Sequence, residues 1–221
     1  MQDLGTLSPA IHYRTHLPEN IVQQFVEEVD TQSFPYHDLE KAVLSDGRED
    51  TRVRNCQLTT FPTFHWFSGF LWHYIARANR ESFLYDITCI ENEAVCYIEY
   101  TQGNFYTWHM DHDINCMLGF NVKHNRNTNL AHEKAIINGE VVRKLSFTLQ
   151  LSSPDDYEGG ELQLLRQGSS LQAGKCSSMF TVPKELGLLT VFDSRIAHRV
   201  RKVKSGKRKS LVGWVMGPRW K

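Results

Sequence analysis

The chain has 221 residues, of which 41% are hydrophobic and 23% charged, and its formal net charge is zero. These values exclude global disorder and argue against a surface built mainly to bind nucleic acid or acidic membranes. Five cysteines without a CxxC pair indicate reduced thiols rather than a disulfide framework. No signal peptide is visible, and no apolar run approaches the roughly 18 residues that span a bilayer, so we expect a cytoplasmic protein with no membrane partner.

The first 82 residues are predicted to form a helix-rich N-terminal support. The expected elements are a strand at residues 11–17, an amphipathic helix opened by Pro18, a strand at residues 52–60 and a helix at residues 61–81. His65 and His73 fall on this last helix about two turns apart, without a ligand partner one turn away. We interpret both as packed or half-exposed side chains rather than metal ligands.

From residue 83 onward the apolar pattern has a period of two, which predicts short strands. They are expected at residues 84–90, 94–101, 105–111, 144–151, 161–165, 179–182, 188–192, 198–203 and 209–216. Helices followed by many short strands predict an α+β, mainly β fold with a double-sheet jelly roll. We expect one domain, 1–221, in which residues 83–221 form the jelly-roll core and the polar stretch 112–142 forms a lid or insert.

One short motif and a distant histidine together predict a metal site. His109 and Asp111 are two residues apart on a predicted strand, so an imidazole and a carboxylate point to the same side. His198 follows the strand-like run LLTVFDS, precedes another predicted strand and is the natural third ligand, although a lone histidine there could also be a buried side chain bonded to a carbonyl. Two histidines and one carboxylate are typical of non-haem Fe(II) oxygenases.

A basic residue is predicted to face the same cavity. On the last strand, Arg208, Ser210 and Trp214 share one face, and a buried Arg requires an anionic partner. Its planar guanidinium suits a bidentate bond to a carboxylate, which a dianionic co-substrate would supply. On residues 145–151, the side chains of Ser146, Thr148 and Gln150 alternate with apolar ones, as expected for a strand with a polar cavity face and a helix-packed outer face.

Taken together, these segments resemble a known family. His109-Met110-Asp111, then RKLSFTLQLSSPDDYEGGELQLL, then VFDSRIAHRV and SGKRKSLVGWVMGP, resemble the 2-oxoglutarate/Fe(II)-dependent dioxygenases of the prolyl 4-hydroxylase-like group, often called PKHD-type hydroxylases. YTQGNFYTWHMD is similar to that group's Tyr-x-x-Gly-x-x-Tyr-x-x-His-x-Asp signature. The resemblance covers roughly residues 94–218 and includes no motif from the first ninety residues.

The resemblance implies a double-stranded β-helix, a cupin-like jelly roll, with Fe(II) held by His109, Asp111 and His198. It implies 2-oxoglutarate and O2 as co-substrates, with ascorbate as a possible reductant. Arg208 would meet the far carboxylate of 2-oxoglutarate. Tyr100 matches a residue that helps to bind this carboxylate, with Ser210 nearby, and Ser146 stands where a small hydroxyl residue is common.

Two aromatic residues are assigned to the substrate side by the same resemblance. Trp214 matches an aromatic residue that lines the cavity, and Tyr106 matches a residue often found near the substrate. Tyr106 is an odd number of steps from His109, so simple alternation predicts that it faces away. A bulge or the end of the strand would reconcile the two predictions.

We therefore predict an enzyme that hydroxylates an unactivated C–H bond and releases succinate and CO2. The substrate is expected to be a prolyl or other amino-acid residue in a protein or peptide; the alternative is a free amino acid or small metabolite. A non-catalytic jelly-roll binding module is the rival from another class. His112 and Asp113 could support the ligands or form a shifted ligand set, but they are interpreted as ordinary lid residues.

The run from Arg199 to Lys209 contains seven basic residues and has two interpretations. One is a patch for a polyanion or a targeting signal. The other, which we favour, is a strand edge protected from aggregation by Lys and Arg. The Arg-rich motif expected of related nucleic-acid demethylases is missing after His198, which argues against a nucleic-acid partner and favours a protein or small-molecule substrate.

Overall fold

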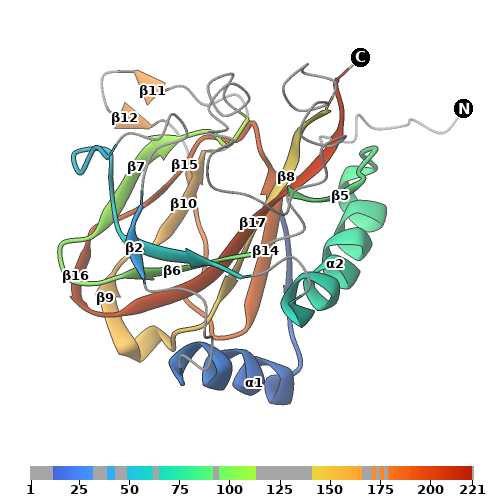
Figure 1. The fold of residues 1–221 in the computed structure, drawn as a ribbon. Helices are drawn as coiled ribbons and strands as arrows, with labels where there is room; N and C mark the ends of the chain where they lie inside the picture. Colours follow the sequence, from blue (N-terminus) through green and yellow to red (C-terminus); the bar gives the residue numbers. More distant parts are fainter. Residues whose placement is uncertain are drawn as a thin grey trace, which may run out of the picture.

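The computed structural model describes residues 12–31, 39–42, 49–61, 65–91, 95–112, 141–165, 171–172, 175–176 and 179–220. Two antiparallel sheets face one another across the middle of the molecule, and two helices cover the outer side of the larger sheet (Figure 1). Most of the predicted lid lies outside the described residues. Within the described residues, no helix is both long and apolar enough to cross a membrane.

The larger sheet has eight strands. Its strand order is β1 (His12–His16), β14 (Leu188–Asp193), β8 (Val141–Gln150), β17 (Arg208–Pro218), β6 (Cys96–Tyr100), β4 (Gln57–Thr60) and β2 (Glu40–Lys41), while β5 (Cys89–Ile90) also pairs with β17. β8 and β17 are the two longest strands and lie side by side at its centre. Polar side chains of the site, such as Ser146 and Arg208, therefore lie on the two central strands of this sheet.

The smaller sheet has five strands and carries both predicted histidine ligands. Its order is β13 (Met179–Thr181), β10 (Leu162–Leu165), β15 (His198–Val200), β7 (Phe105–His109) and β3 (Arg54–Asn55). Two short ladders complete the described fold: β9 (Tyr157–Gly159) with β16 (Val203–Gly206), and β11 (Leu171–Gln172) with β12 (Lys175–Cys176).

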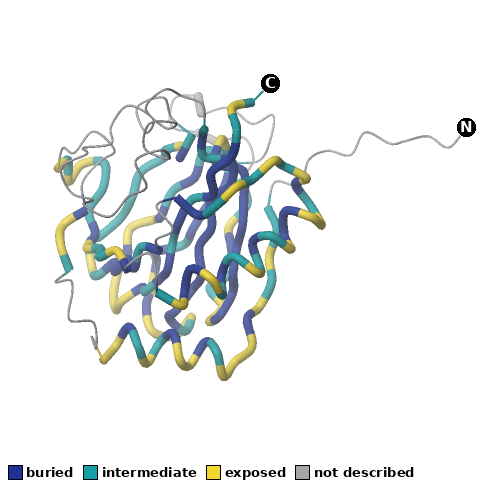
Figure 2. The backbone as a smooth tube through the Cα atoms, turned by 45° about the vertical axis from the view of Figure 1, so that its right-hand side comes forward, coloured by how far each residue is buried: buried dark blue, intermediate teal, exposed yellow. Residues whose placement is uncertain are grey.

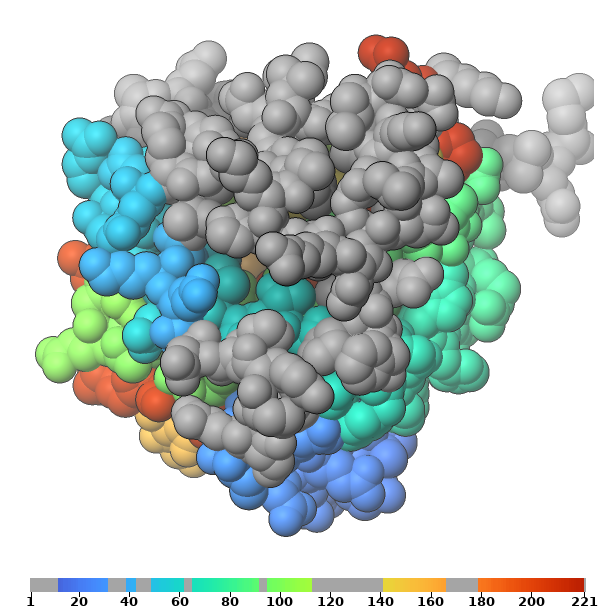
Figure 3. Space-filling model, in the orientation of Figure 1, coloured from blue at the N-terminus to red at the C-terminus, as the bar shows by residue number. Residues whose placement is uncertain are grey.

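Alternation along β8 separates a helix-packed face from a polar face, as predicted. Leu145, Phe147 and Leu149 join the apolar core that includes the buried residues of α1 (Glu19–Asp30) and α2 (Trp66–Ala78). A second core lies between the two sheets and includes Leu164 and Val200. In Figure 2, where the backbone is coloured by burial, the buried strands lie in the centre of the molecule. In Figure 3, the two helices lie along the lower and right margins of the face shown. Burial of both faces thus fixes the register of the central strands.

The helix predicted at residues 61–81 begins later than expected. α2 starts at Trp66, because His65 takes the N-cap position and its Nδ1 accepts the backbone N–H of Phe67 at 3.4 Å. The other ring nitrogen of His65 lies 2.8 Å from Glu28, whose second oxygen accepts the indole N–H of Trp66 at 2.7 Å. His65 therefore caps one helix and ties it to α1, which agrees with its structural interpretation.

The strand predicted at residues 84–90 is mostly wrong. A π-helical turn, η1 (Asn79–Phe83), extends α2, and Leu84 then adopts a left-handed conformation with φ 55°. The side-chain amide of Asn79 bonds both the N–H and the carbonyl of Tyr85 at 2.9 Å. These bonds satisfy the Tyr85 backbone without a partner strand, so strand pairing in this stretch is restricted to β5.

The strand predicted at residues 198–203 is in fact two strands. β15 pairs with β7 and β10 in the smaller sheet, whereas β16 pairs with β9. The chain changes partners at Arg201 and Lys202, which belong to neither strand. An apolar alternation that continues through such a change of partner cannot reveal it.

Candidate metal centre

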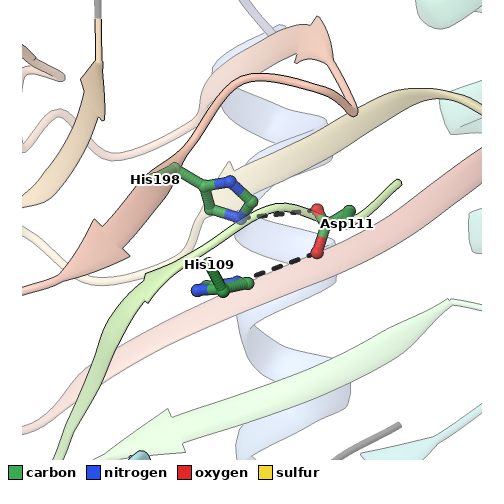
Figure 4. Close-up of side chains that lie close together, drawn as sticks. All are labelled: His109, Asp111 and His198. Carbon is green, nitrogen blue, oxygen red and sulfur yellow. Dashed lines mark ion pairs between the residues drawn. The ribbon is translucent and has the colours of Figure 1, made fainter. Parts of the chain in front are cut away.

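Three side chains that could hold a metal ion converge where β7 and β15 meet. His109 ends β7, His198 begins β15, and the two residues stand directly opposite each other in the antiparallel ladder. Asp111 follows in the turn after β7, rather than in the strand predicted to include it. Its Oδ1 lies 3.7 Å from Nε2 of His109, and its Oδ2 lies 3.4 Å from Nε2 of His198 (Figure 4). One potential ligand atom from each of the three residues lies within 4.8 Å of the other two.

The orientation of both imidazoles suits metal binding. Nδ1 of His109 lies 2.8 Å from the carbonyl of Thr107, and Nδ1 of His198 lies 3.0 Å from the carbonyl of Ile196. A carbonyl oxygen only accepts, so in the neutral ring each Nδ1 carries the proton and each Nε2 keeps its lone pair. Both lone pairs therefore point toward the Asp111 carboxylate, which is the arrangement that bound metal ions require of histidine.

The electrostatic environment favours the protonation states that bind a cation. Burial raises the pKa of Asp111, but the charges of His198, His109 and Arg143 and a hydrogen bond from Ser146 outweigh it and lower this pKa to about 2. Burial, with the charge of His198, lowers the pKa of His109 to about 3. At neutral pH the carboxylate is ionised and His109 is neutral, so both are ready to act as ligands.

In the metal-free protein, we expect stability to fall as the pH is lowered from about 6.5 toward 3. The unfolded chain protonates His109 near its ordinary pKa of about 6.5, whereas the folded chain does so only near 3. Between these values the unfolded state binds more protons, so the free energy of unfolding decreases by up to about 1.4 kcal/mol per pH unit. Above about pH 6.5 this contribution is fully present.

Urea denaturation of the metal-free protein between about pH 5 and pH 7 tests this pH dependence. His109→Asn should flatten the slope, whereas the same change at His73, which is exposed on α2, should leave it unaltered. Equal slopes for the wild type and His109→Asn would contradict the assigned protonation state.

A second layer of hydrogen bonds fixes Asp111. The hydroxyl of Ser146, on β8, donates to Oδ2 of Asp111 at 2.6 Å and lies 3.0 Å from the hydroxyl of Ser194. The carbonyl of Ser194 accepts the backbone N–H groups of Asp111 and His112, both at 3.0 Å. The sequence did not single out Ser194, because a serine after a strand is an ordinary turn residue. Both serines are buried, so their bonds are shielded from water.

Replacing Ser146 with Ala should weaken metal binding without unfolding the protein. Loss of an outer partner of a metal ligand typically costs ten- to a hundredfold in affinity, so we expect the Kd for Fe(II) or Co(II) to rise by about tenfold. The matched control is Ser68→Ala, which removes a buried serine hydroxyl on α2 that has no hydrogen-bond partner among the described residues. Titration calorimetry of both variants decides the matter, and equal affinities would contradict a supporting role for Ser146.

Arg208 lies at the wall of a small cavity between the sheets. It opens β17 opposite Tyr100 on β6, is 4% exposed, and donates from Nη1 to the hydroxyl of Ser210 at 3.1 Å. Its guanidinium carbon lies 5.4 Å from the centre of the Tyr100 ring. Among the described residues, no carboxylate forms an ion pair with Arg208, so a buried cation faces the cavity without an anion.

The cavity walls also contain hydroxyl groups that have no hydrogen-bond partner. Thr148 and Thr190 both line the cavity, and both side-chain oxygens are buried and unbonded within the described structure. Gln150, Tyr157 and Lys184 complete the polar lining. Unbonded buried hydroxyls are costly, and together with Arg208 they form a wall suited to a small anionic ligand.

The aromatic residues assigned to the substrate side lie near the triad. Tyr106 stacks on the His109 ring with centroids 3.5 Å apart, although alternation predicts that it faces away. Its partner in β15 is Val200, so three steps on β7 match two on β15, and this bulge turns Tyr106 back toward His109. Trp214 lies opposite Ser146 and packs 4.0 Å beneath the guanidinium of Arg143.

The basic run from Arg199 to Lys209 is largely neutralised within the fold. Arg201 pairs with Glu161 at 3.6 Å, Lys207 with Glu99 at 2.9 Å, Lys204 with Glu158 and Lys209 with Asp30. Arg199 donates to Gln163 at 2.8 Å and lies over the ring of Trp108. These contacts favour a protected strand edge over a polyanion patch.

Comparisons with known proteins point to one family. A family model described as the 2OG-Fe(II) oxygenase superfamily matches residues 95–216. Proteins named PKHD-type hydroxylase from Parvibaculum lavamentivorans and Crocosphaera subtropica are 41% and 39% identical over 71 residues, which is 32% of this chain. The same match covers 28% of each relative, so less than a third of their length is represented.

Solved structures share the fold at low sequence identity. A prolyl-4-hydroxylase from Pseudomonas putida has a TM-score of 0.62 at 17% identity, over 95% of this chain and 94% of that one. A prolyl hydroxylase from Trichoplax adhaerens, in complex with a hypoxia inducible factor oxygen degradation domain peptide fragment, has a TM-score of 0.64 at 16% identity, over 94% and 84%. At this identity the likeness concerns the fold, and it confirms the predicted double-stranded β-helix.

Proposed function

The chain belongs to the 2OG-Fe(II) oxygenase superfamily, and from that premise we propose that it is an Fe(II)- and 2-oxoglutarate-dependent hydroxylase. The observation that carries this proposal is the convergence of His109, Asp111 and His198 with both Nε2 lone pairs directed at one carboxylate. Two imidazoles and a carboxylate suit Fe(II) and leave the other positions of a six-coordinate ion open for co-substrate and O2.

The protein's part in the reaction is to hold the metal, orient its ligands and shield the site from water. When bound, Fe(II) with 2-oxoglutarate and O2 supplies the oxidising chemistry that inserts one oxygen atom into a C–H bond and the other into succinate, with release of CO2. His109, Asp111 and His198 would hold the metal, and Ser146 with Ser194 keeps the carboxylate in place. No side chain is required as a general base for this oxidation.

The cavity beside Arg208 is the site we propose for the co-substrate. A dianion supplies the negative charge that the buried guanidinium lacks, and its carboxylate can accept hydrogen bonds from Thr148, Thr190 and Tyr100. Such charge-assisted bonds are about twice as strong as neutral ones. Leu162 and Leu188 supply apolar lining to the same cavity.

The proposed substrate is a prolyl or other amino-acid residue within a protein or peptide. Two neighbours in fold carry the name of prolyl hydroxylases, and one of them is in complex with a peptide fragment. The internal neutralisation of the Arg199–Lys209 run supports a protein substrate over nucleic acid. Hydroxylation of a free amino acid is the second candidate, because the resemblance to the family is equally compatible with an amino acid that is not part of a peptide.

One assay tests the reaction and the substrate class together. The protein is incubated with Fe(II), labelled 2-oxoglutarate, ascorbate as the reductant, and separate peptide and amino-acid pools. We expect succinate and a product heavier by about 16 Da, the mass of one inserted oxygen. A product in the peptide pool supports the proposed substrate, whereas a product only in the amino-acid pool supports the second candidate. Binding of 2-oxoglutarate without any succinate would instead identify a non-catalytic module.

A further inference from the structure

A bulge in β8 of the larger sheet brings Arg143 to the face of the sheet that carries Ser146. Val215 of β17 pairs with Leu145 of β8, but the next residue, Met216, pairs with Arg143. Lys144 is therefore an extra residue on β8, and beyond it the alternation of faces is reversed. Arg143 thereby lies on the same face as Ser146, although simple counting from Ser146 would place it on the outer face.

The guanidinium of Arg143 connects three groups around the triad. Nε and Nη2 donate to one oxygen of Glu91 at 2.9 Å and 2.7 Å, and Glu91 is buried. Nη1 donates to the backbone carbonyl of Asp111 at 3.4 Å. Its flat face covers the ring of Trp214 at 4.0 Å. One side chain thus touches a buried anion, the peptide of a metal ligand and an aromatic wall.

The peptide of Asp111 is held from two directions. Ser194 accepts its N–H, and Arg143 donates to its carbonyl, so both sides of the ligand residue are anchored to other segments. The carbonyl of Arg143 also lies 3.0 Å from Nδ1 of His112, the next residue in this turn. Movement of the Arg143 side chain would therefore affect Asp111 and Trp214 together.

We propose that Arg143 is a positioning residue that couples the aromatic wall at Trp214 to the metal ligand Asp111. The proposal rests on the proposed function, since it assigns Arg143 a role in the same site. Only a planar fork can bond Glu91 with two nitrogens, reach the Asp111 carbonyl and lie flat on an indole at once. Lysine keeps the charge but offers a point-like ammonium, so it should not replace this arrangement.

Metal binding gives the first test. Co(II) is titrated into the metal-free wild type, Arg143→Met and Arg143→Lys, and its visible absorption reports the ligand geometry. We expect Arg143→Met to weaken binding by about tenfold, in the range found for outer partners of metal ligands, and to change the spectrum. Arg143→Lys should stay within about threefold of Arg143→Met, because the planar fork matters more than the charge. Wild-type affinity in either variant would overturn the proposal.

Arg195→Met is a matched control for this titration. Arg195 pairs with Asp193 at 2.5 Å and lies 4.0 Å over the ring of Trp220, so it repeats the contacts of Arg143 with a carboxylate and an indole. It differs in making no hydrogen bond to a ligand residue within the described structure. Its variant should bind Co(II) as the wild type does. Failure of the wild type itself to bind metal would instead refute the proposed function.

Tryptophan fluorescence gives a second readout that does not depend on metal. If Arg143 covers Trp214, removing the guanidinium exposes the indole, so quenching by acrylamide should increase in Arg143→Met. The increase should disappear when Trp214 is also changed to Phe. An increase that persists in the double variant would show general loosening of the fold and would count against the coupling.

Discussion

Replacing His198 with Ala is expected to abolish the formation of succinate from 2-oxoglutarate. The imidazole supplies one of three metal ligands, and its Nε2 is held toward Asp111 by the bond from Nδ1 to the Ile196 carbonyl. Without it, the site keeps one imidazole and one carboxylate, and we expect metal binding to become too weak to saturate. The measurements are Co(II) titration and succinate release, compared with wild-type protein treated with a chelator.

The control for His198→Ala is the same change at His73, which is exposed on α2 and should leave metal binding and turnover intact. Circular dichroism and urea denaturation show whether the variant folds. We expect that it does, because the strand pairing at position 198 is made by the backbone, which alanine retains. Iron- and 2-oxoglutarate-dependent turnover that persists in folded His198→Ala would refute the assignment of the triad.

Replacing Arg208 with Met is expected to separate co-substrate binding from stability. Truncating one partner of a buried, hydrogen-bonded charge pair costs about 2 kcal/mol or more, so KM for 2-oxoglutarate should rise at least about thirtyfold. The metal-free, ligand-free protein should become no less stable, because the buried cation has no carboxylate partner among the described residues and its desolvation is unfavourable.

Thermal unfolding of metal-free Arg208→Met checks its stability, and succinate release at varied 2-oxoglutarate gives its KM. Thermal unfolding of the metal-loaded variant with and without 2-oxoglutarate then reports co-substrate binding. The co-substrate should raise the Tm of the wild type by mass action and have little effect on the variant. Arg201→Met provides the control, because Arg201 belongs to the same basic run but pairs with Glu161 at the surface. An unchanged KM in Arg208→Met would place the co-substrate elsewhere.

The sequence predicted the parts of the site that depend on regular alternation. His109, Asp111 and His198 lie close together, although Asp111 is in the turn after β7, and Arg208 and Ser210 share one face of β17 as alternation along that strand predicts. The roles proposed for Tyr100, Ser210, Tyr106 and Trp214 in binding remain predictions. Ser146 is found bonded to Asp111, so its hydroxyl supports a metal ligand directly.

The sequence could not predict what depends on bulges and on changes of partner. One extra residue on β7 turns Tyr106 toward His109, and one on β8 turns Arg143 toward Asp111. Neither leaves a mark in the order of apolar and polar residues, because the alternation on each side of a bulge is regular. The π-helical turn before Leu84 was also missed: the backbone N–H of Leu84 bonds the carbonyl of Asn79, and the Asn79 side chain then bonds the backbone of Tyr85, which the order of apolar and polar residues does not reveal.

Each imidazole is oriented by a backbone carbonyl of its own chain segment. His109 is oriented by the carbonyl of Thr107 and His198 by that of Ile196, each two residues earlier, and one step of the β7–β15 ladder then joins the two halves. Segments between these strands can therefore gain or lose residues without turning either ring.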